Sequence, residues 1–174
     1  MIHYAATSTP YGPVLTAATP AGICAIRFGK SSRLLQELKK EFPHARFVPG
    51  AEHLAPLVQR VKKALRSGKA SGLALDLRGT SFQQRVWQAI REIPAGQTAS
   101  YGDLARRIGR PEAVRAVARA CATNPVAMLV PCHRVLGKNG KLSGFRWGLG
   151  LKRRLLMKEK SNFRRRSKWN RLWV

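Results

Sequence analysis

Apolar residues in the first part of the chain fall first into short alternating runs and then into a helical spacing. The runs IHYAATST, PVLTAAT and GICAIRFG are β-prone and are separated by the turn sequences PYG and PAG. They predict three strands of an antiparallel meander within residues 1–30. SSRLLQELKKEF opens with a serine suited to cap a helix, and AEHLAPLVQRVKKALRSG is a second helical pattern that closes at Gly68. With GLALDLRG as a further strand, residues 1–77 are predicted to form a small α+β unit.

After residue 78 the pattern becomes mainly helical. TSFQQRVWQAIREI begins with a cap at Thr80 or Ser81 and repeats apolar residues on one face. SYGDLARRIG is a short helix stopped by Gly109, and RPEAVRAVARACATN is another with Pro111 at its first position. Two short helices joined by a glycine-containing turn are typical of a helix-turn-helix.

The end of the chain adds a turn signal, one more helix and a basic tail. GKNGKL predicts a hairpin, which after a helix-turn-helix suggests a winged arrangement. A basic helix is expected from about Leu149 to Lys160. We therefore predict a second domain over residues 78–160 and an appended basic tail over residues 161–174.

Charge changes this picture most. The chain has 33 Lys and Arg against 8 Asp and Glu, a formal net charge of +25. Such an excess implies a polyanionic partner, because self-repulsion otherwise opposes the compact state. Membrane-surface binding is the rival interpretation, but no strongly amphipathic free helix supports it. No apolar stretch is long enough to span a bilayer and the start lacks a secretion-signal pattern, so a cytoplasmic, nucleoid-associated protein is expected.

The second helix of the pair carries a candidate DNA-binding face. Val114, Val117 and Cys121 recur at helical steps and are expected to face the core. The other side presents Arg115, Ala116 and Arg119. Small residues let a helix approach DNA closely, and arginines reach phosphates or enter the base stack. An ordinary solvated face is the alternative, and the net charge favours DNA.

The three cysteines are Cys24, Cys121 and Cys132. Their spacing suits neither a disulfide framework nor a zinc site, and no metal or other cofactor is expected. Cys24 and Cys121 lie in apolar patterns and are predicted to be core residues. Cys132 ends an apolar run, follows a proline and precedes His133 and Arg134, so core cysteine, metal ligand and nucleophile are all candidates.

A nucleophilic Cys132 would need further groups. Neighbouring positive charge lowers a thiol pKa, and His133 is the nearest base. Adjacent side chains on a helical turn splay apart, so His133 is expected to reach the thiol through a water. A third group should orient the imidazole, and Glu159 is the natural choice. The alternative for Glu159 is a surface salt bridge within the last helix.

Four stretches together carry a family resemblance: NPVAMLVPCHRV, SGFRWG, GTSFQQRVWQAI and EAVRAVARACATN. They resemble the O6-alkylguanine-DNA alkyltransferases over about residues 80–160, closest to the stand-alone bacterial enzymes and the C-terminal half of the adaptive-response protein Ada. The fold class expected is α+β, with a small N-terminal antiparallel sheet and helices (RNase H-like) and a C-terminal winged helix-turn-helix-like domain.

The resemblance also implies a reaction. It is the irreversible, single-turnover transfer of a methyl group from O6-methylguanine in DNA to Cys132 after base flipping, with O4-methylthymine as a further substrate to consider. His133 would be the base acting through water, and Glu159 would hold it. Asn124 would brace the active-site turn, and Lys152 would aid thiolate formation.

Further roles concern the DNA. Tyr101 would help rotate the nucleotide and protonate the departing guanine, and Arg115 would fill the gap left by the extruded base. The backbone of Val135 would help read the guanine edge. Trp147 would lie near the pocket mouth, where its bulk would favour methyl over benzyl-sized groups. The partner implied is double-stranded DNA, contacted through the minor groove with little sequence preference by a monomer.

The same residues distinguish the alkyltransferases from two other classes of DNA-binding protein. Alkyltransferase-like proteins bind lesions but lack the acceptor cysteine, which Cys132 supplies here. A winged-helix transcription regulator would not need Cys132, His133 and Glu159, and usually has a more polar recognition helix. The zinc-binding and activator segments of the full adaptive-response protein are absent, so no regulatory role is expected.

Overall fold

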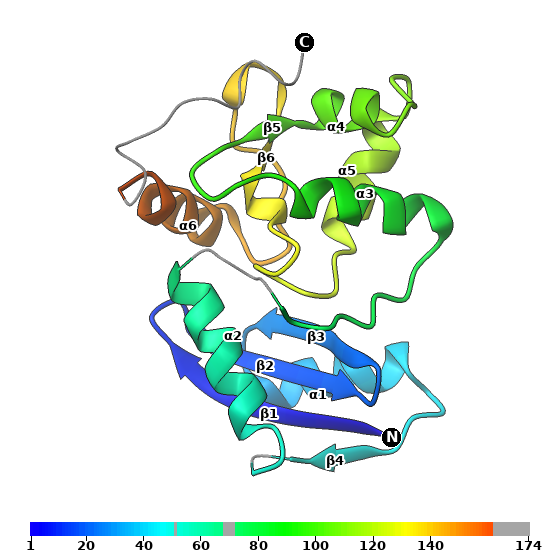
Figure 1. The fold of residues 1–174 in the computed structure, drawn as a ribbon, viewed down its shortest axis with the longest axis vertical. Helices are drawn as coiled ribbons and strands as arrows, with labels where there is room; N and C mark the ends of the chain where they lie inside the picture. Colours follow the sequence, from blue (N-terminus) through cyan, green and yellow to red (C-terminus); the bar gives the residue numbers. More distant parts are fainter. Residues whose placement is uncertain (51, 68–71, 162–174) are drawn as a thin grey trace. The chain divides into compact units, whose positions relative to one another are not determined.

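The computed structural model describes residues 1–50, 52–67 and 72–161, and the chain forms two compact units (Figure 1). The first contains Met1–Arg78 together with Pro125–Leu129, and the second contains Gly79–Asn124 and the chain from Val130 onward. The architecture is α+β, as predicted. The division into domains at residues 77 and 78 stays a prediction, and it did not foresee that residues 125–129 belong with the first unit.

The first unit is built on a four-stranded sheet of order β3-β2-β1-β4. Strands β1 (Ile2–Thr9), β2 (Gly12–Thr19) and β3 (Gly22–Phe28) form the antiparallel meander that the turn sequences predicted. The short strand β4 (Phe47–Pro49) was missed, and it pairs with β1 in parallel. The sheet is therefore mixed and not purely antiparallel, because the chain reaches β4 through a helix and not through a tight turn.

Two helices pack with this sheet. α1 (Ser31–Glu41) buries Leu34 and Leu38 in a cluster with Leu15 and Ala17 of β2, as its leucine spacing indicates. Its N-cap is Lys30, which makes no side-chain capping bond, so the predicted serine cap is wrong. α2 (Ala55–Ser67) buries Val58 against Ala5 and Ala18 of the sheet.

Two short segments of the chain pair with the outer edge of β3, which is the edge strand of the sheet. The strand expected over residues 72–79 is reduced to an isolated parallel bridge between Ile23 and Leu75. Gly22 has a φ of +147°, and a Cβ there would lie 2.6 Å from the carbonyl oxygen of Ala74, so this approach requires glycine. Further along β3, Ile26 N–H donates to Pro125 O at 3.0 Å and Ala127 N–H donates to Ile26 O at 2.9 Å.

Helices dominate the second unit. α3 (Ser81–Arg91) starts with a capping box in which Thr80 and Gln83 bond reciprocally, and Trp87 Nε1 donates to Ala120 O at 2.9 Å. α4 (Tyr101–Arg107) and α5 (Val114–Ala122) are the predicted helix pair. Pro111 precedes α5 and does not open it. Val114 is 38% exposed, contrary to the predicted core position, because it lies in the first turn of the helix.

Short elements and a last helix complete this unit. β5 (Ala99–Ser100) and β6 (Val135–Leu136) pair in parallel, and 3₁₀ turns form at Cys132–Arg134 (η1) and Lys138–Gly140 (η2). The predicted hairpin is wrong. Asn139 and Gly140 take left-handed conformations inside η2, and Gly137 N–H donates to Lys141 O at 2.8 Å with no flanking antiparallel strands among the described residues.

α6 (Leu149–Ser161) matches the predicted final helix. The proposed basic tail lies almost entirely outside the described residues. Within the part of the chain that the structure describes, no helix combines the length and apolar character needed to cross a membrane.

Candidate active site

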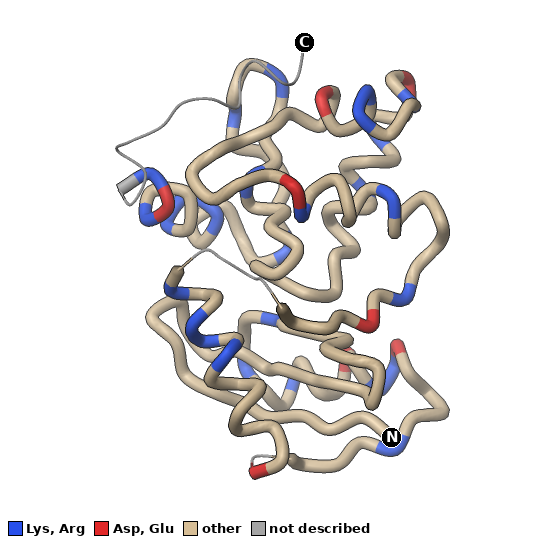
Figure 2. The backbone as a smooth tube through the Cα atoms, in the orientation of Figure 1, with Lys and Arg blue, Asp and Glu red and all other residues tan. Residues whose placement is uncertain are grey.

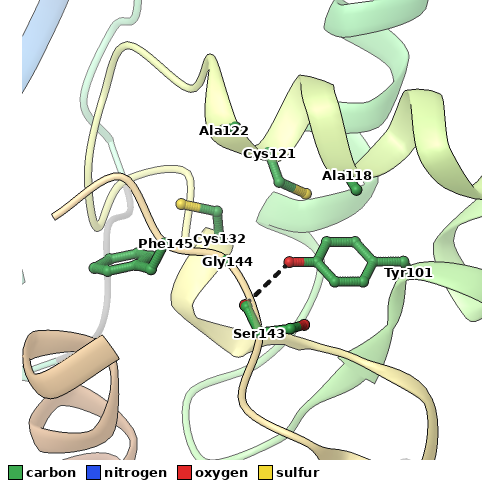
Figure 3. Close-up of a pocket in the computed structure, with 8 residues that line it drawn as sticks. All are labelled: Tyr101, Ala118, Cys121, Ala122, Cys132, Ser143, Gly144 and Phe145. Carbon is green, nitrogen blue, oxygen red and sulfur yellow. Dashed lines mark hydrogen bonds between the residues drawn. The ribbon is translucent and has the colours of Figure 1, made fainter. Parts of the chain in front are cut away.

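The cysteine of the PCHR stretch lies in the wall of a cavity in the second unit. Cys132 is only 5% exposed and sits on η1, at the end of the buried apolar run that the sequence shows. The cavity has a volume of about 210 Å³ (Figure 3). It is lined by Tyr101, Ala118, Cys121, Ala122, Cys132, Ser143, Gly144 and Phe145. The sulfur that the sequence singled out thus reaches a space that can hold a ligand.

Asn124 braces the turn that carries this cysteine. Its buried side-chain amide donates to Val130 O at 2.8 Å and to Cys132 Sγ at 3.1 Å. The first bond fixes the backbone two residues before the cysteine, and the second supplies a donor to the sulfur. A donor to sulfur favours the thiolate, so Asn124 acts on both the position and the charge of Cys132.

The thiol is nevertheless protonated in this state. Burial raises the pKa of Cys132 to about 11, although the Asn124 amide and the charge of Lys152 each lower it. The predicted net lowering of this pKa by neighbouring charge is therefore wrong. The physical reason is desolvation, which here outweighs the favourable charges. Arg134, two residues after Cys132, directs its guanidinium at Glu159.

His133 is fully buried and joined to Glu159, with its Nε2 2.9 Å from Oε1. Burial lowers the pKa of His133, although the carboxylate opposes this shift. The imidazole is then neutral at neutral pH, and donation from Nε2 to the carboxylate leaves Nδ1 as an acceptor. Nδ1 is buried and has no hydrogen-bond partner among the described residues. His133, the residue after Cys132, therefore keeps a basic nitrogen that can accept a proton.

Glu159 is the centre of a buried ionic group. Arg134 donates to it in a fork, from Nε at 3.0 Å and from Nη2 at 2.8 Å, and Gly96 N–H donates at 3.2 Å. Burial would raise the pKa of this carboxyl, but its hydrogen bonds to His133 and Arg134 lower it to about 2. Arg134 also donates to Ile93 O at 2.5 Å. Sequence reasoning gave Arg134 only an electrostatic part beside the thiol and missed this structural one.

Lys152 comes from the same buried face of α6. Its side chain is fully buried, and Nζ donates to Val135 O at 2.6 Å, Ser143 O at 2.7 Å and Gly144 O at 3.1 Å. Burial lowers the pKa of this ammonium group. Three carbonyl acceptors hold the charge in place, and one of them belongs to Val135, the backbone group expected to meet a guanine edge.

Two aromatic side chains, Tyr101 and Phe145, also line the cavity (Figure 3). Tyr101, the first residue of α4, donates its hydroxyl to Ser143 O at 3.3 Å, and burial raises its pKa. Phe145 lines the cavity, and Trp147 packs edge-on against it with ring centroids 5.2 Å apart. The sequence pointed to Trp147, whereas the residue in the lining is Phe145. Only its place in SGFRWG could have indicated it.

Helix α5 contributes to the cavity as well as to the surface. Arg115 and Arg119 are exposed and Ala116 is half-buried, which agrees with a solvent-facing side. Ala118, Cys121 and Ala122 line the cavity from the same helix. Cys121 was predicted to be a core residue, and it is buried, but it is also a wall of the site. Burial raises its pKa strongly, so this second thiol stays protonated.

Known proteins resemble the chain over most of its length. Residues 81–161 match the family model for the 6-O-methylguanine DNA methyltransferase DNA-binding domain. The chain is 45% identical over 163 residues to the bifunctional transcriptional activator/DNA repair enzyme Ada of Escherichia coli, covering 92% of this chain and 46% of Ada. It thus spans about half the length of that relative. It is 42% identical to a methylated-DNA–protein-cysteine methyltransferase of Mycobacterium tuberculosis, covering 92% of this chain and 94% of the relative.

Solved structures give the same picture. The crystal structure of Mycobacterium tuberculosis O6-methylguanine methyltransferase matches with a TM-score of 0.74 and 39% identity, and covers 99% of both chains. The structure from that organism determined in complex with DNA matches with a TM-score of 0.75 and 41% identity, covering 91% of this chain and 93% of the other.

Proposed function

Because the chain belongs to the methylated-DNA–protein-cysteine methyltransferase family, we propose that it repairs DNA by direct reversal. In this proposal it moves the methyl group of O6-methylguanine to its own Cys132 and acts once. The observation that carries the proposal is the cavity that Cys132 and Tyr101 both line, together with the buried His133–Glu159 pair, whose histidine follows the cysteine in sequence.

The proposed transfer is a displacement at carbon. His133 Nδ1 takes the thiol proton through a water, and the thiolate attacks the methyl carbon of the lesion. A sulfur–carbon bond forms as the carbon–O6 bond breaks, and guanine leaves as an anion. The Tyr101 hydroxyl then protonates the leaving base. The thioether is stable, so the acceptor is not regenerated, and the transfer requires no cofactor.

Because the pKa of Cys132 is raised, the groups around it must promote the loss of its proton. Proton transfer to His133 creates an imidazolium, and the ionised Glu159 stabilises that charge at 2.9 Å. Arg134 keeps Glu159 ionised. Asn124 and Lys152 favour the thiolate as it forms. The charge separation takes place inside protein, where such interactions are stronger than in water.

The base must leave the double helix before the sulfur can reach it. We assign this step to α5 and Tyr101, with Arg115 filling the vacated place and Ala116 and Arg119 lying against the backbone. Ala118 and Ala122 support this assignment, because they put the same helix at the cavity. Val135 O remains able to accept from the guanine edge through its second lone pair.

The wider proposals follow from the family. The partner is double-stranded DNA, entered from the minor groove with little sequence preference, and the protein works as a cytoplasmic, nucleoid-associated monomer. O4-methylthymine is a further substrate to test in parallel.

The decisive experiment uses duplex DNA that carries O6-methylguanine with a radiolabelled methyl group. We expect one label per protein molecule, located on the Cys132 peptide by mass spectrometry. Cys132→Ala should take up none, and Cys24→Ala, which alters a buried cysteine of the first unit, should take up as much as the unaltered protein. Label in the Cys132→Ala variant, or label on another residue of the unaltered protein, would rule the proposal out.

A further inference from the structure

A small cavity of the first unit lies between the end of β1 and the second half of α2. It has a volume of about 150 Å³ and is lined by Ser8, Thr9, Pro10, Lys62, Leu65 and Arg66. Leu65 is buried and Lys62 is half-buried, whereas Ser8 and Arg66 are exposed. This cavity, called here the β1–α2 cavity, shares no residue with the cavity that contains Cys132.

The two cations of the β1–α2 cavity lack an acidic side chain that could neutralise them. Among the described residues, neither Lys62 nor Arg66 has a hydrogen-bond or ion-pair partner. All 8 acidic residues of the chain belong to the described part, and none of them lines the cavity. Basic positions recur along α2 and no position in it is acidic (Figure 2). Glu52 precedes this helix, whereas both cations lie in its second half.

The stability of α2 accounts for only part of this arrangement. A cation in the last turn interacts favourably with the helix dipole, which explains Arg66. Lys62 lies one turn earlier, where that interaction has faded, and its side chain is partly withdrawn from water. The two cations are four residues apart, a spacing at which like charges repel on a helix. A hollow lined by charge of one sign concentrates its field, so an anion in the cavity would remove this repulsion.

The chemistry of the lining indicates which anion fits. An arginine fork and a lysine ammonium both bind phosphate oxygens, and the hydroxyl of Ser8 can donate a further hydrogen bond. The hydroxyl of Thr9 is already engaged in the turn, because it donates to Gly12 O at 2.7 Å and accepts from Tyr11 N–H at 3.2 Å. Pockets for whole small molecules enclose roughly 300–1,000 Å³. The smaller β1–α2 cavity therefore suits a phosphate group and not a complete nucleotide.

We propose that the β1–α2 cavity binds inorganic phosphate or the phosphate group of a small phosphomonoester. Two cations match a group that carries about −1.5 to −2 charge at pH 7. A phosphodiester of the DNA backbone carries a single charge and is therefore the weaker ligand here. The inference rests on the first unit alone and does not require methyl transfer to Cys132.

The test follows the backbone amide NMR signals of the full chain at low chloride concentration. The chain is titrated separately with inorganic phosphate, ribose 5-phosphate and dimethyl phosphate. The test variant is Lys62→Gln/Arg66→Gln. The matched control is Lys39→Gln/Lys40→Gln, which removes two exposed charges from α1 in the same unit. Glutamine is a good helix former, and circular dichroism verifies that both variants fold.

Inorganic phosphate and ribose 5-phosphate should shift the amide signal of Ser8 saturably in the unaltered protein and in the α1 variant. Their Kd should rise at least about tenfold in the α2 variant, because two charge-assisted contacts are lost. Binding of ribose 5-phosphate should strengthen from pH 5 to pH 7, since the second pKa of its phosphate is about 6. Either order of affinity between these two probes supports the proposal, and the tighter one identifies the source of the phosphate group.

Three results would overturn the inference. The first is the absence of a saturable shift at Ser8 with both inorganic phosphate and ribose 5-phosphate. The second is an equal loss of affinity in the α1 variant, which would mean that net charge alone attracts the anion. The third is binding of dimethyl phosphate as tight as that of ribose 5-phosphate, which would make the cavity a contact for the DNA backbone. A protein that binds phosphate here but transfers no methyl group refutes only the proposed function.

Discussion

Glu159 connects the chemistry of the site to the stability of the second unit. Its folded-state pKa of about 2 lies below the ordinary value of a glutamate, so the ionised carboxylate stabilises the folded protein. The sign follows from that direction. The stabilisation is complete above the unfolded pKa of roughly 4.3 and is lost as the pH falls toward 2.

We therefore expect the free energy of unfolding to fall between pH 5 and pH 2 by about 3 kcal/mol more in the unaltered protein than in Glu159→Gln. At pH 7 the same substitution should destabilise by about 3–5 kcal/mol, because Arg134 stays buried without its counter-charge. Urea unfolding at several pH values measures both. Glu112→Gln, which alters an exposed carboxylate, is the control. Parallel pH profiles of the unaltered protein and Glu159→Gln would contradict the assignment.

The aromatic pair beside the cavity predicts which alkyl groups fit. Phe145 is part of the lining, whereas Trp147 is outside it and packs against Phe145. We expect Phe145→Ala to raise the rate of transfer from O6-benzylguanine relative to O6-methylguanine by about tenfold, since a pocket contact of one or two groups is worth roughly 1–3 kcal/mol. Trp147→Ala should have a smaller effect in the same direction.

Competition between the two free bases, followed by mass spectrometry of Cys132, measures this preference. A larger effect of Trp147→Ala than of Phe145→Ala would mean that Trp147, the residue that the sequence suggested, limits the size of the alkyl group. Equal activity of the unaltered protein on both bases would remove the size limit altogether.

For single residues, the sequence predicted which side chains come together better than it predicted their pKa values. The contact between His133 and Glu159 could be predicted in advance, because a histidine base is expected to need a carboxylate that orients it. The pKa of the Cys132 thiol could not be predicted, because it depends on burial by residues distant in sequence. Arg134 is instructive in the same way. Its position two residues after Cys132 suggested that its charge favours the thiolate, but in the fold its guanidinium binds Glu159.

Among the elements, α5 joins the surface to the cavity. We expect Arg115→Ala to slow methyl transfer from duplex DNA by about a hundredfold, since unstacking a base without a substitute costs a few kcal/mol. Transfer from the free base O6-methylguanine should change little. Quenched-flow rates with both substrates measure the difference, and Arg91→Ala on the exposed side of α3 is the control. Equal losses with both substrates would defeat the assigned role.

Element prediction succeeded where a regular period extends over several turns. α1, α2 and α3 have such periods, and capping sequences at Thr80 and Ser100 fix the starts of α3 and α4. β4 spans three residues and pairs in parallel, so neither alternation nor a turn sequence marked it. The GKNG sequence is compatible with both a hairpin and a 3₁₀ turn, and only the presence or absence of a partner strand decides between them.

For the molecule as a whole, we expect the charge of +25 to make the proposed DNA binding depend on salt. Each phosphate contact should contribute a slope of about −0.9 to the logarithm of affinity against the logarithm of salt concentration. Titrations of a lesion-free duplex at several salt concentrations measure the slope. Methyl transfer from the uncharged free base is the control and should be insensitive to salt. A flat profile with duplex DNA would refute the electrostatic interpretation of the basic residues.

Residues 125–129 belong to the first unit although the chain on both sides of them belongs to the second. This limits how the protein can be cut into separate domains. Asn124 and Val130, joined by a 2.8 Å hydrogen bond, stand where the chain leaves the second unit and returns to it. A fragment starting at Gly79 would carry Pro125 and Ala127 but leave behind Ile26, their backbone partner. Cutting the polypeptide once cannot yield the acceptor half intact. Engineering a minimal version would require redesigning that apolar loop as a solvated one.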